Sequence, residues 1–268
     1  MGARGYIIRT IVSTLGVISL VVGFNAFVDP YGIVGTTRVD GINANKVDIN
    51  LHTRQMKRYQ PGFARYDALL AGKSRVEMGL DPAHRCLAGR GLSTYNIGVP
   101  GATLDEQIAY ALNVIYQQDI RTLVMAVDFT DFISTSAPVA RTSLFDRTAG
   151  DLQVLPSGQP NPEFLQVKFM DYLKALFSID ATVSSTKTLL GQGPMAPDRT
   201  DQGFNPGGDF AWIVAVEGPR ALFDQKMVEL VASYGRPWYL RNASGRLPQA
   251  FDDFERFLDV LAERGIQV

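Results

Sequence analysis

The sequence predicts an α/β protein in which a central parallel sheet forms the middle layer of a three-layer sandwich, preceded by one N-terminal transmembrane helix. Two observations lead to this prediction. Residues 10–28 form an apolar run without a charge, and residues 93–127 read as strand, turn, helix and strand, which is the order of a βαβ unit. With 268 residues, of which 46% are hydrophobic, the chain is long enough to bury a substantial core.

Composition excludes several classes of function. The chain has 26 Lys and Arg against 27 Asp and Glu, a formal charge of −1, so no basic field predicts nucleic acid as a partner. The single cysteine, Cys86, excludes an intrachain disulfide and any zinc cluster of paired cysteines. We expect neither a metal nor a cofactor. Only two histidines, His52 and His84, are available for imidazole chemistry.

The first element is a helix over residues 10–28. Such a helix is about 28 Å long, close to the ~30 Å hydrocarbon core of a bilayer. A cleaved signal peptide is disfavoured because the run exceeds the usual apolar region and no A-x-A-like site precedes Asp29. A buried core helix is disfavoured because the run has no polar face. Arg4 and Arg9 precede the run, so we expect a single pass through a bacterial inner membrane with a cytoplasmic N-terminus and a periplasmic or extracytoplasmic main domain.

The rest of the chain is predicted to form a connector and one domain. Residues 29–65 read as a juxtamembrane connector with a short helix near 52–59. Residues 66–268 read as the α/β domain, interrupted at about 133–218 by a helical and loop insertion. Such an insertion either forms a lid over a site or has a purely structural role, packed on the sandwich, and the sequence favours neither.

Three strands are expected in this domain, at 68–72, 93–97 and 122–127. The last is continuously apolar, which predicts a central position in a parallel sheet. Ligands of open α/β sheets gather at the carboxyl ends of the strands. We therefore expect three segments to converge, namely 72–74, 98–101 and 128–131.

The helix between the last two strands, 104–118, begins with a capping box of Thr103 and Glu106. Helices are also expected at three later places, 162–177, 179–190 and 219–234.

The last helix is expected at about 248–264, with Gly265 as its cap. An apolar stripe is predicted along it, formed by Phe251, Phe254, Leu258 and Leu261. Residues 266–268 then begin another strand, so we expect the domain to be incomplete at its C-terminus. A fragment from about residue 40 to residue 268 is expected to be poorly stable, because a sheet lacking one strand exposes an edge.

The turn Gly72-Lys73-Ser74 permits two chemical interpretations. A phosphate-binding loop requires G-x-x-x-x-G-K-[ST], but Asp67 stands where the first glycine belongs, which argues against nucleotide binding. The alternative makes Ser74 a nucleophile on the turn after the first strand.

These residues resemble the SGNH (GDSL-like) hydrolases and acyltransferases. Gly72-Lys73-Ser74 matches the G-x-S block of that family, and the segment 96–103 matches its N-x-G-x-x-G-x-T block in full. The chain also resembles a membrane-anchored bacterial branch with a Gly-x-Ser-Arg turn, whose members handle acyl groups on cell-surface polymers. The resemblance covers residues 67–131 well and the C-terminal part poorly.

The resemblance implies a role for each matching residue. Ser74 would be the nucleophile, the amides of Ser74 and Gly101 would hold the oxyanion, and Asn96 would orient the motif. Thr130 stands where the family has an oxyanion-binding asparagine. The family's basic histidine, in a C-terminal D-x-x-H block, is missing, and His84 reads as a surface or structural residue.

Two functions remain open. The first is a membrane-anchored extracytoplasmic serine esterase or O-acyltransferase that acts on acyl groups of envelope or cell-surface polymers, and whose base either lies in a missing C-terminal part or comes from elsewhere. The second is a non-catalytic, membrane-tethered scaffold or binding protein in envelope assembly. The expected partners are the lipid bilayer, through residues 10–28, and an acylated glycan or small ester.

Overall fold

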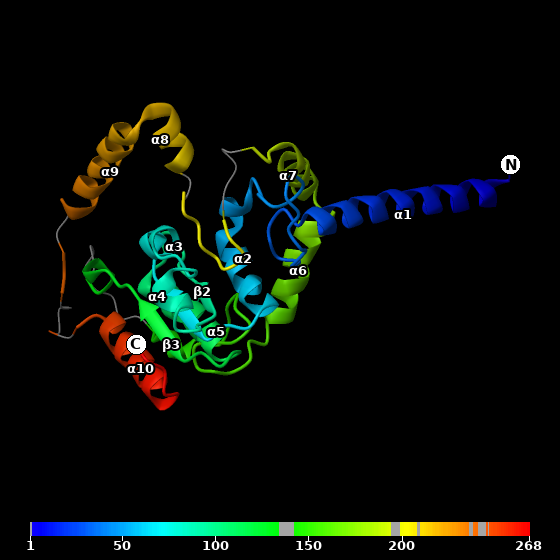
Figure 1. Cartoon of the computed structure of the whole chain (residues 1–268). Coiled ribbons are helices and arrows are strands. Elements are labelled where there is room, and N and C mark those ends of the chain that lie inside the picture. The colour runs from blue at the N-terminus through cyan, green and yellow to red at the C-terminus, as the bar shows by residue number, and fades with distance from the viewer. Residues whose placement is uncertain are drawn as a thin grey trace. The chain divides into compact units, whose positions relative to one another are not determined.

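The computed structural model describes residues 2–133, 142–193, 199–207, 210–235, 238–240, 245 and 247–268 (Figure 1). Its contacts divide the chain into two units. The anchor unit combines Met1–Met56 with Leu165–Asp198, and the sheet unit combines Lys57–Phe164 with Arg199–Val268. Part of the expected insertion at 133–218 thus belongs with the N-terminal helix, whereas the expected role of that insertion as a lid stays a prediction.

The sheet unit contains the parallel sheet expected of an α/β protein. Its strands are β1 (Ala68–Ala71), β2 (Thr94–Asn96) and β3 (Thr122–Met125), in the order β2-β1-β3. All three lie within the predicted strand ranges. β1 is buried along its whole length, which explains why it reads as an unbroken apolar run.

The central strand is β1, so the prediction that residues 122–127 form the centre is wrong for the three named strands. β3 does have a second neighbour at its start, because Thr122 forms a parallel bridge with Gln267. The Leu123 amide donates to the Gln267 carbonyl at 2.8 Å, and the Gln267 amide donates to the Arg121 carbonyl at 2.9 Å. The expected strand at 266–268 therefore begins beside β3.

The sheet unit also contains helices, of which α3 and α5 contact β1. Those that the structure describes are α3 (Ser74–Gly79), α4 (Arg85–Ala88), α5 (Leu104–Ile115), α8 (Ala211–Glu217), α9 (Pro219–Tyr234) and α10 (Gln249–Glu263). The Thr103 hydroxyl caps α5 by accepting from the Glu106 amide at 3.3 Å, as the capping-box prediction requires. α5 packs on β1 and on α10, and its buried apolar side chains form a large part of the core of the unit.

The buried face of α10 differs from the predicted stripe. Phe257 and Leu261 are fully buried, whereas Leu258 is exposed. Asp253 is also buried on this face, where its carboxylate accepts from the Ser143 hydroxyl and the Leu144 amide. The prediction was wrong at Leu258 because it considered apolar residues only. The face that is actually buried includes the polar residue Asp253 and leaves Leu258 exposed. Gly265, with φ of +68°, caps the helix as expected.

The anchor unit consists of three long helices and the loops between them. Its first helix is α1 (Ala3–Val28), and the other two are α7 (Ile179–Leu190) and α6 (Phe164–Phe177), of which Phe164 falls in the sheet unit. The short helix α2 (Thr53–Tyr59) contains the boundary between the units. α1 is long and apolar enough to cross a membrane, with a mean hydropathy of 2.1 over its most apolar window.

Buried polar contacts fix the end of α1 against α7. Asn25 is fully buried, and its amide donates to the Leu176 carbonyl at 3.0 Å and the Thr182 hydroxyl at 3.1 Å. The Ser185 hydroxyl donates to the Asn25 side-chain oxygen at 2.8 Å. These hydrogen bonds provide partners for the polar atoms of the buried asparagine side chain, so α1 and α7 are held in one register.

Candidate functional site

The carboxyl ends of the three strands meet at one edge of the sheet, as predicted. The Val99 amide donates to the Gly72 carbonyl at 2.9 Å, which joins the loop after β2 to the turn after β1. The Ala126 amide donates to the Ala71 carbonyl at 3.0 Å, which joins the end of β3 to the same turn. We call this edge, formed by residues 72–74, 98–101 and 128–131, the carboxyl edge.

Ser74 is the first residue of α3 and lies directly after the turn that ends β1. Its side chain is half-buried. The turn requires glycine at position 72, because a Cβ there would lie 2.9 Å from the Ala126 carbonyl oxygen and still closer to the Val76 side chain. The backbone of the turn therefore packs tightly against β3 and presents Ser74 at the carboxyl edge.

Asn96 joins the end of β2 to the helix that begins at Ser74. Its side-chain amide donates to the carbonyl oxygens of Val76 and Leu80, both at 2.8 Å, and its side-chain oxygen accepts from the Gly98 amide at 2.9 Å. Both donor hydrogens and one acceptor site of the side chain are thus committed to the backbone of α3 and its C-terminal cap and of the loop after β2. Asn96 is therefore a positioning residue.

Gly101 and Thr130 occupy the other two segments of the carboxyl edge. Gly101 is exposed, has φ of +65°, and has open space around the position of a Cβ. Thr130 is half-buried within a 3-10 turn, Phe129–Asp131, that follows β3. The structure thus places both residues at the edge where Ser74 lies, and their predicted role in binding an oxyanion stays a prediction.

Ion pairs balance the charges of the carboxyl edge. Lys73 contacts Asp131 directly and lies 3.5 Å from a carboxylate oxygen of Asp128, while Arg75 bonds Asp128 at 2.8 Å. Gln107 of α5 also donates to Asp131, at 3.4 Å. Two carboxylates therefore face two cations, so their repulsion of a developing oxyanion is compensated. Lys73, engaged by both carboxylates, is poorly placed to bind a phosphate.

Both histidines are held in local contacts. His84 caps α4, where its Nδ1 accepts from the Cys86 amide at 3.3 Å. His52 belongs to the anchor unit, stacks on Tyr31 with 3.6 Å between ring centroids, and pairs with Gln55 at 3.2 Å. Burial lowers the pKa of His52. Among the described residues, no hydrogen bond joins a histidine to the Ser74 hydroxyl.

A buried charge cluster, which the sequence did not predict, lies under the carboxyl edge. Glu77 of α3 accepts from Arg199 at 2.6 Å and lies 3.4 Å from the Lys57 ammonium. All three side chains are almost completely buried. Lys57 also donates to the carbonyl oxygens of Asn96, at 2.9 Å, and Gly203, at 3.0 Å. The three charged residues come from three distant segments of the chain, so no local pattern reveals the cluster.

Comparison of the chain with protein-family models, curated proteins and solved structures finds no match. Among the described residues, no group of three or more His, Cys, Asp and Glu side chains has the arrangement of a metal site. The geometry of the carboxyl edge is therefore the basis on which a function is argued.

Proposed function

We propose that the sheet unit is an SGNH-like serine esterase or O-acyltransferase domain, anchored to the membrane by α1. The observation that carries the proposal is the position of Ser74, on the tight turn after β1, with the loop of the N-x-G-x-x-G-x-T motif bonded to that turn through Val99 and Gly72. The three-layer arrangement of the family, with helices on both faces of the sheet, is part of this proposal.

In the proposed reaction the Ser74 oxygen attacks the carbonyl carbon of an acyl ester. The carbonyl oxygen becomes an oxyanion, which the amides of Ser74 and Gly101 and the Thr130 hydroxyl stabilise. The ester bond then breaks, and the leaving alcohol takes up the proton that Ser74 gave to a base. Water or a sugar hydroxyl next accepts the acyl group and regenerates the serine. Acyl groups of envelope or cell-surface polymers are the proposed substrates.

Attack by Ser74 requires a base other than the two histidines in their present contacts. Lys73 is unsuited to this role, because it is engaged in ion pairs with Asp128 and Asp131. The local contacts of His52 and His84 favour the second candidate function, a non-catalytic scaffold or binding protein in envelope assembly. The two candidates predict opposite results for a single serine variant.

The test is hydrolysis of p-nitrophenyl acetate by the full chain in detergent. We expect turnover above the uncatalysed rate in the wild type and a loss of about 10³-fold or more in Ser74→Ala. Ser157→Ala is the matched control, because Ser157 is an exposed serine in a turn of the same unit. Equal rates for all three proteins would reject the esterase and leave the scaffold.

We propose further that α1 crosses a bacterial inner membrane with its N-terminus in the cytoplasm and the sheet unit outside. Arg4 and Arg9 at the N-terminal side of α1 support this orientation through the positive-inside tendency.

Cys86 offers a direct test, because it is the only cysteine of the chain and is exposed in the sheet unit. A membrane-impermeant maleimide should label Cys86 in spheroplasts without lysis. In a Cys86→Ser background, an Arg4→Cys variant should be labelled only after lysis. The reverse pattern would overturn the proposed orientation.

A further inference from the structure

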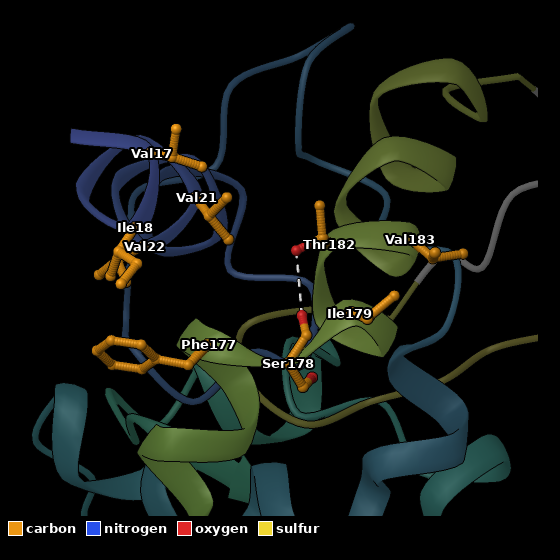
Figure 2. Close-up of a pocket in the computed structure, with 9 residues that line it drawn as sticks. All are labelled: Val17, Ile18, Val21, Val22, Phe177, Ser178, Ile179, Thr182 and Val183. Carbon is orange, nitrogen blue, oxygen red and sulfur yellow. Dashed lines mark hydrogen bonds between the residues drawn. The ribbon is translucent and has the colours of Figure 1, made fainter. Parts of the chain in front are cut away.

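An apolar cavity of about 340 Å³ lies inside the anchor unit, between α1 and the corner where α6 ends and α7 begins (Figure 2). One wall consists of four aliphatic side chains of α1, namely Val17, Ile18, Val21 and Val22. The other wall consists of Phe177, Ile179 and Val183 with the two polar residues between them. The volume is in the range of pockets that bind small ligands.

The two polar residues of the wall have partners within the protein. The Thr182 hydroxyl donates to the Ser178 carbonyl at 3.1 Å (Figure 2) and accepts from the Asn25 amide at 3.1 Å. The Ser178 hydroxyl accepts from the Ala181 amide at 3.0 Å. A ligand with its own polar groups would give up hydrogen bonds to water and gain little here. The wall therefore suits a hydrocarbon.

The corner between α6 and α7 exposes large apolar side chains. Ile179 is 81% exposed, Phe177 is 51% exposed and Val183 is 47% exposed, so the cavity is open to its surroundings. α6 continues this surface with the exposed residues Leu165 and Phe169. Apolar side chains gathered in this way on one surface indicate contact with a membrane or a partner.

The position of the cavity along α1 decides between these occupants. Val22 and Val17 precede Asp29, where the apolar run ends, by about 10 and 18 Å of helix respectively. With α1 across a bilayer of ~30 Å hydrocarbon thickness, this stretch extends from near the middle of the bilayer to about 10 Å from the boundary on the Asp29 side. The α6–α7 corner packs beside it, at a depth where lipid acyl chains are the surrounding medium.

We propose that the α6–α7 corner inserts into the bilayer beside α1 and that the cavity between them holds an acyl chain of a membrane lipid. The anchor unit then contacts the membrane through three helices, and α1 is one of them. This inference rests on the proposed membrane anchoring of α1. The test below distinguishes insertion of the α6–α7 corner from anchoring by α1 alone.

The test measures quenching of tryptophan emission by bromine. The full chain, with Trp212 and Trp238 replaced by phenylalanine, is reconstituted into phosphatidylcholine vesicles whose acyl chains carry bromine near their middle. Ile179→Trp reports on the corner, Leu20→Trp on α1, and Phe129→Trp on the sheet unit. All three positions hold large exposed apolar residues, so each variant is expected to fold.

We expect Ile179→Trp and Leu20→Trp to lose most of their emission relative to the same vesicles without bromine, and Phe129→Trp to keep its emission. Quenching of Leu20→Trp alone would overturn the insertion of the corner and leave the anchoring intact. Quenching of neither would overturn both. Emission from Ile179→Trp that is blue-shifted but unquenched would show that protein, such as a second copy, covers the cavity, and would also overturn the proposal.

A second measurement addresses the cavity itself. Native mass spectrometry of the detergent-purified chain should detect a bound phospholipid, and Val21→Trp, which fills the cavity, should reduce the bound fraction. Leu20→Trp, on the exposed surface of α1, is the matched control and should keep it. Equal lipid occupancy in both variants would reject the cavity as the binding site.

Discussion

Burial lowers the pKa of Lys57 from 10.5 to about 7, and the repulsion of Arg199 adds to this effect, although the Glu77 carboxylate opposes both. The neutral amine keeps two hydrogens, which are enough for its bonds to the Asn96 and Gly203 carbonyls. Loss of the proton therefore removes a buried charge without breaking these bonds.

Stability should consequently rise with pH between about 7 and 10. In this range the unfolded chain binds the Lys57 proton and the folded chain does not, so the free energy of unfolding increases by at most about 1.4 kcal/mol per pH unit. Below pH 7 Lys57 is protonated in both the folded and the unfolded chain, so its contribution to the pH dependence of stability disappears. Above pH 10 the buried Tyr66 and Tyr95, whose pKa values are raised by burial, reverse the trend.

Denaturant unfolding of the full chain in detergent at several pH values measures this slope. Lys57→Met should abolish it, because the titrating group is gone. A flat profile in the wild type, or the same slope in the variant, would contradict the prediction.

The sequence predicted the position of Ser74 and its neighbours at the carboxyl edge, but not the buried cluster of Lys57, Glu77 and Arg199. The first group lies in short motifs at the ends of strands, where the type of residue and its spacing carry information. The buried cluster arises from the meeting of segments separated by up to 142 residues, from Lys57 to Arg199. Lys57 reads as part of a solvated helix in the sequence, since nothing nearby signals a buried partner.

At the level of elements, the segment 199–205 acts as a cover on the outer side of β2. The Asn96 amide donates to the Gln202 carbonyl at 2.8 Å, and the Asn205 amide donates to the Glu77 carbonyl at 3.0 Å. Gly203 is required in this segment. Its φ is +78°, and a Cβ would collide with the Asn96 carbonyl oxygen and lie 2.8 Å from the Tyr95 ring.

Gly203→Ala should therefore destabilise the sheet unit by about 2–4 kcal/mol, through backbone strain and displacement of the segment. Gly101→Ala is the matched control. Gly101 has a similar φ of +65° but open space around its Cβ position, so a loss of about 1 kcal/mol is expected. Denaturant unfolding compares the two, and equal losses would show that the segment contributes little to the sheet.

The elements themselves were largely predictable. β1 and β3 lie in short apolar runs that are followed by Gly72 and Asp128, and α5 carries both its cap and its apolar stripe in the sequence. The errors concerned how the elements pack. The order of strands depends on pairing between distant segments, and the buried face of α10 includes Asp253, which hydrophobicity alone places in solvent.

For the whole molecule, the structure gives a second reason to expect that a fragment of residues 40–268 is poorly stable, namely the loss of part of the anchor unit. That fragment lacks Asn25 and Val28, which are fully buried in the anchor unit. Without them the buried face of α7, including Ala181 and Ser185, is exposed. A fragment that begins at residue 17 keeps these contacts, because α1 side chains before that point are exposed.

We expect the fragment 17–268 in detergent to keep the helix content and thermal unfolding of the residues it shares with the full chain. The fragment 40–268 should lose the cooperative unfolding of α6 and α7. Circular dichroism and limited proteolysis between residues 165 and 193 measure both. Equal protection of this segment in the two fragments would contradict the role assigned to Asn25.

The bonds of Asn25 also have a consequence for the order of events during synthesis. The ribosome makes Asn25 160 residues before Ser185, which at 5–20 residues per second is an interval of roughly 10–30 s. Through this interval α1 has no α7 to pack against, and the Asn25 amide depends on water or lipid headgroups for hydrogen bonds. The anchor unit is therefore completed late in translation, after most of the sheet unit has already left the ribosome.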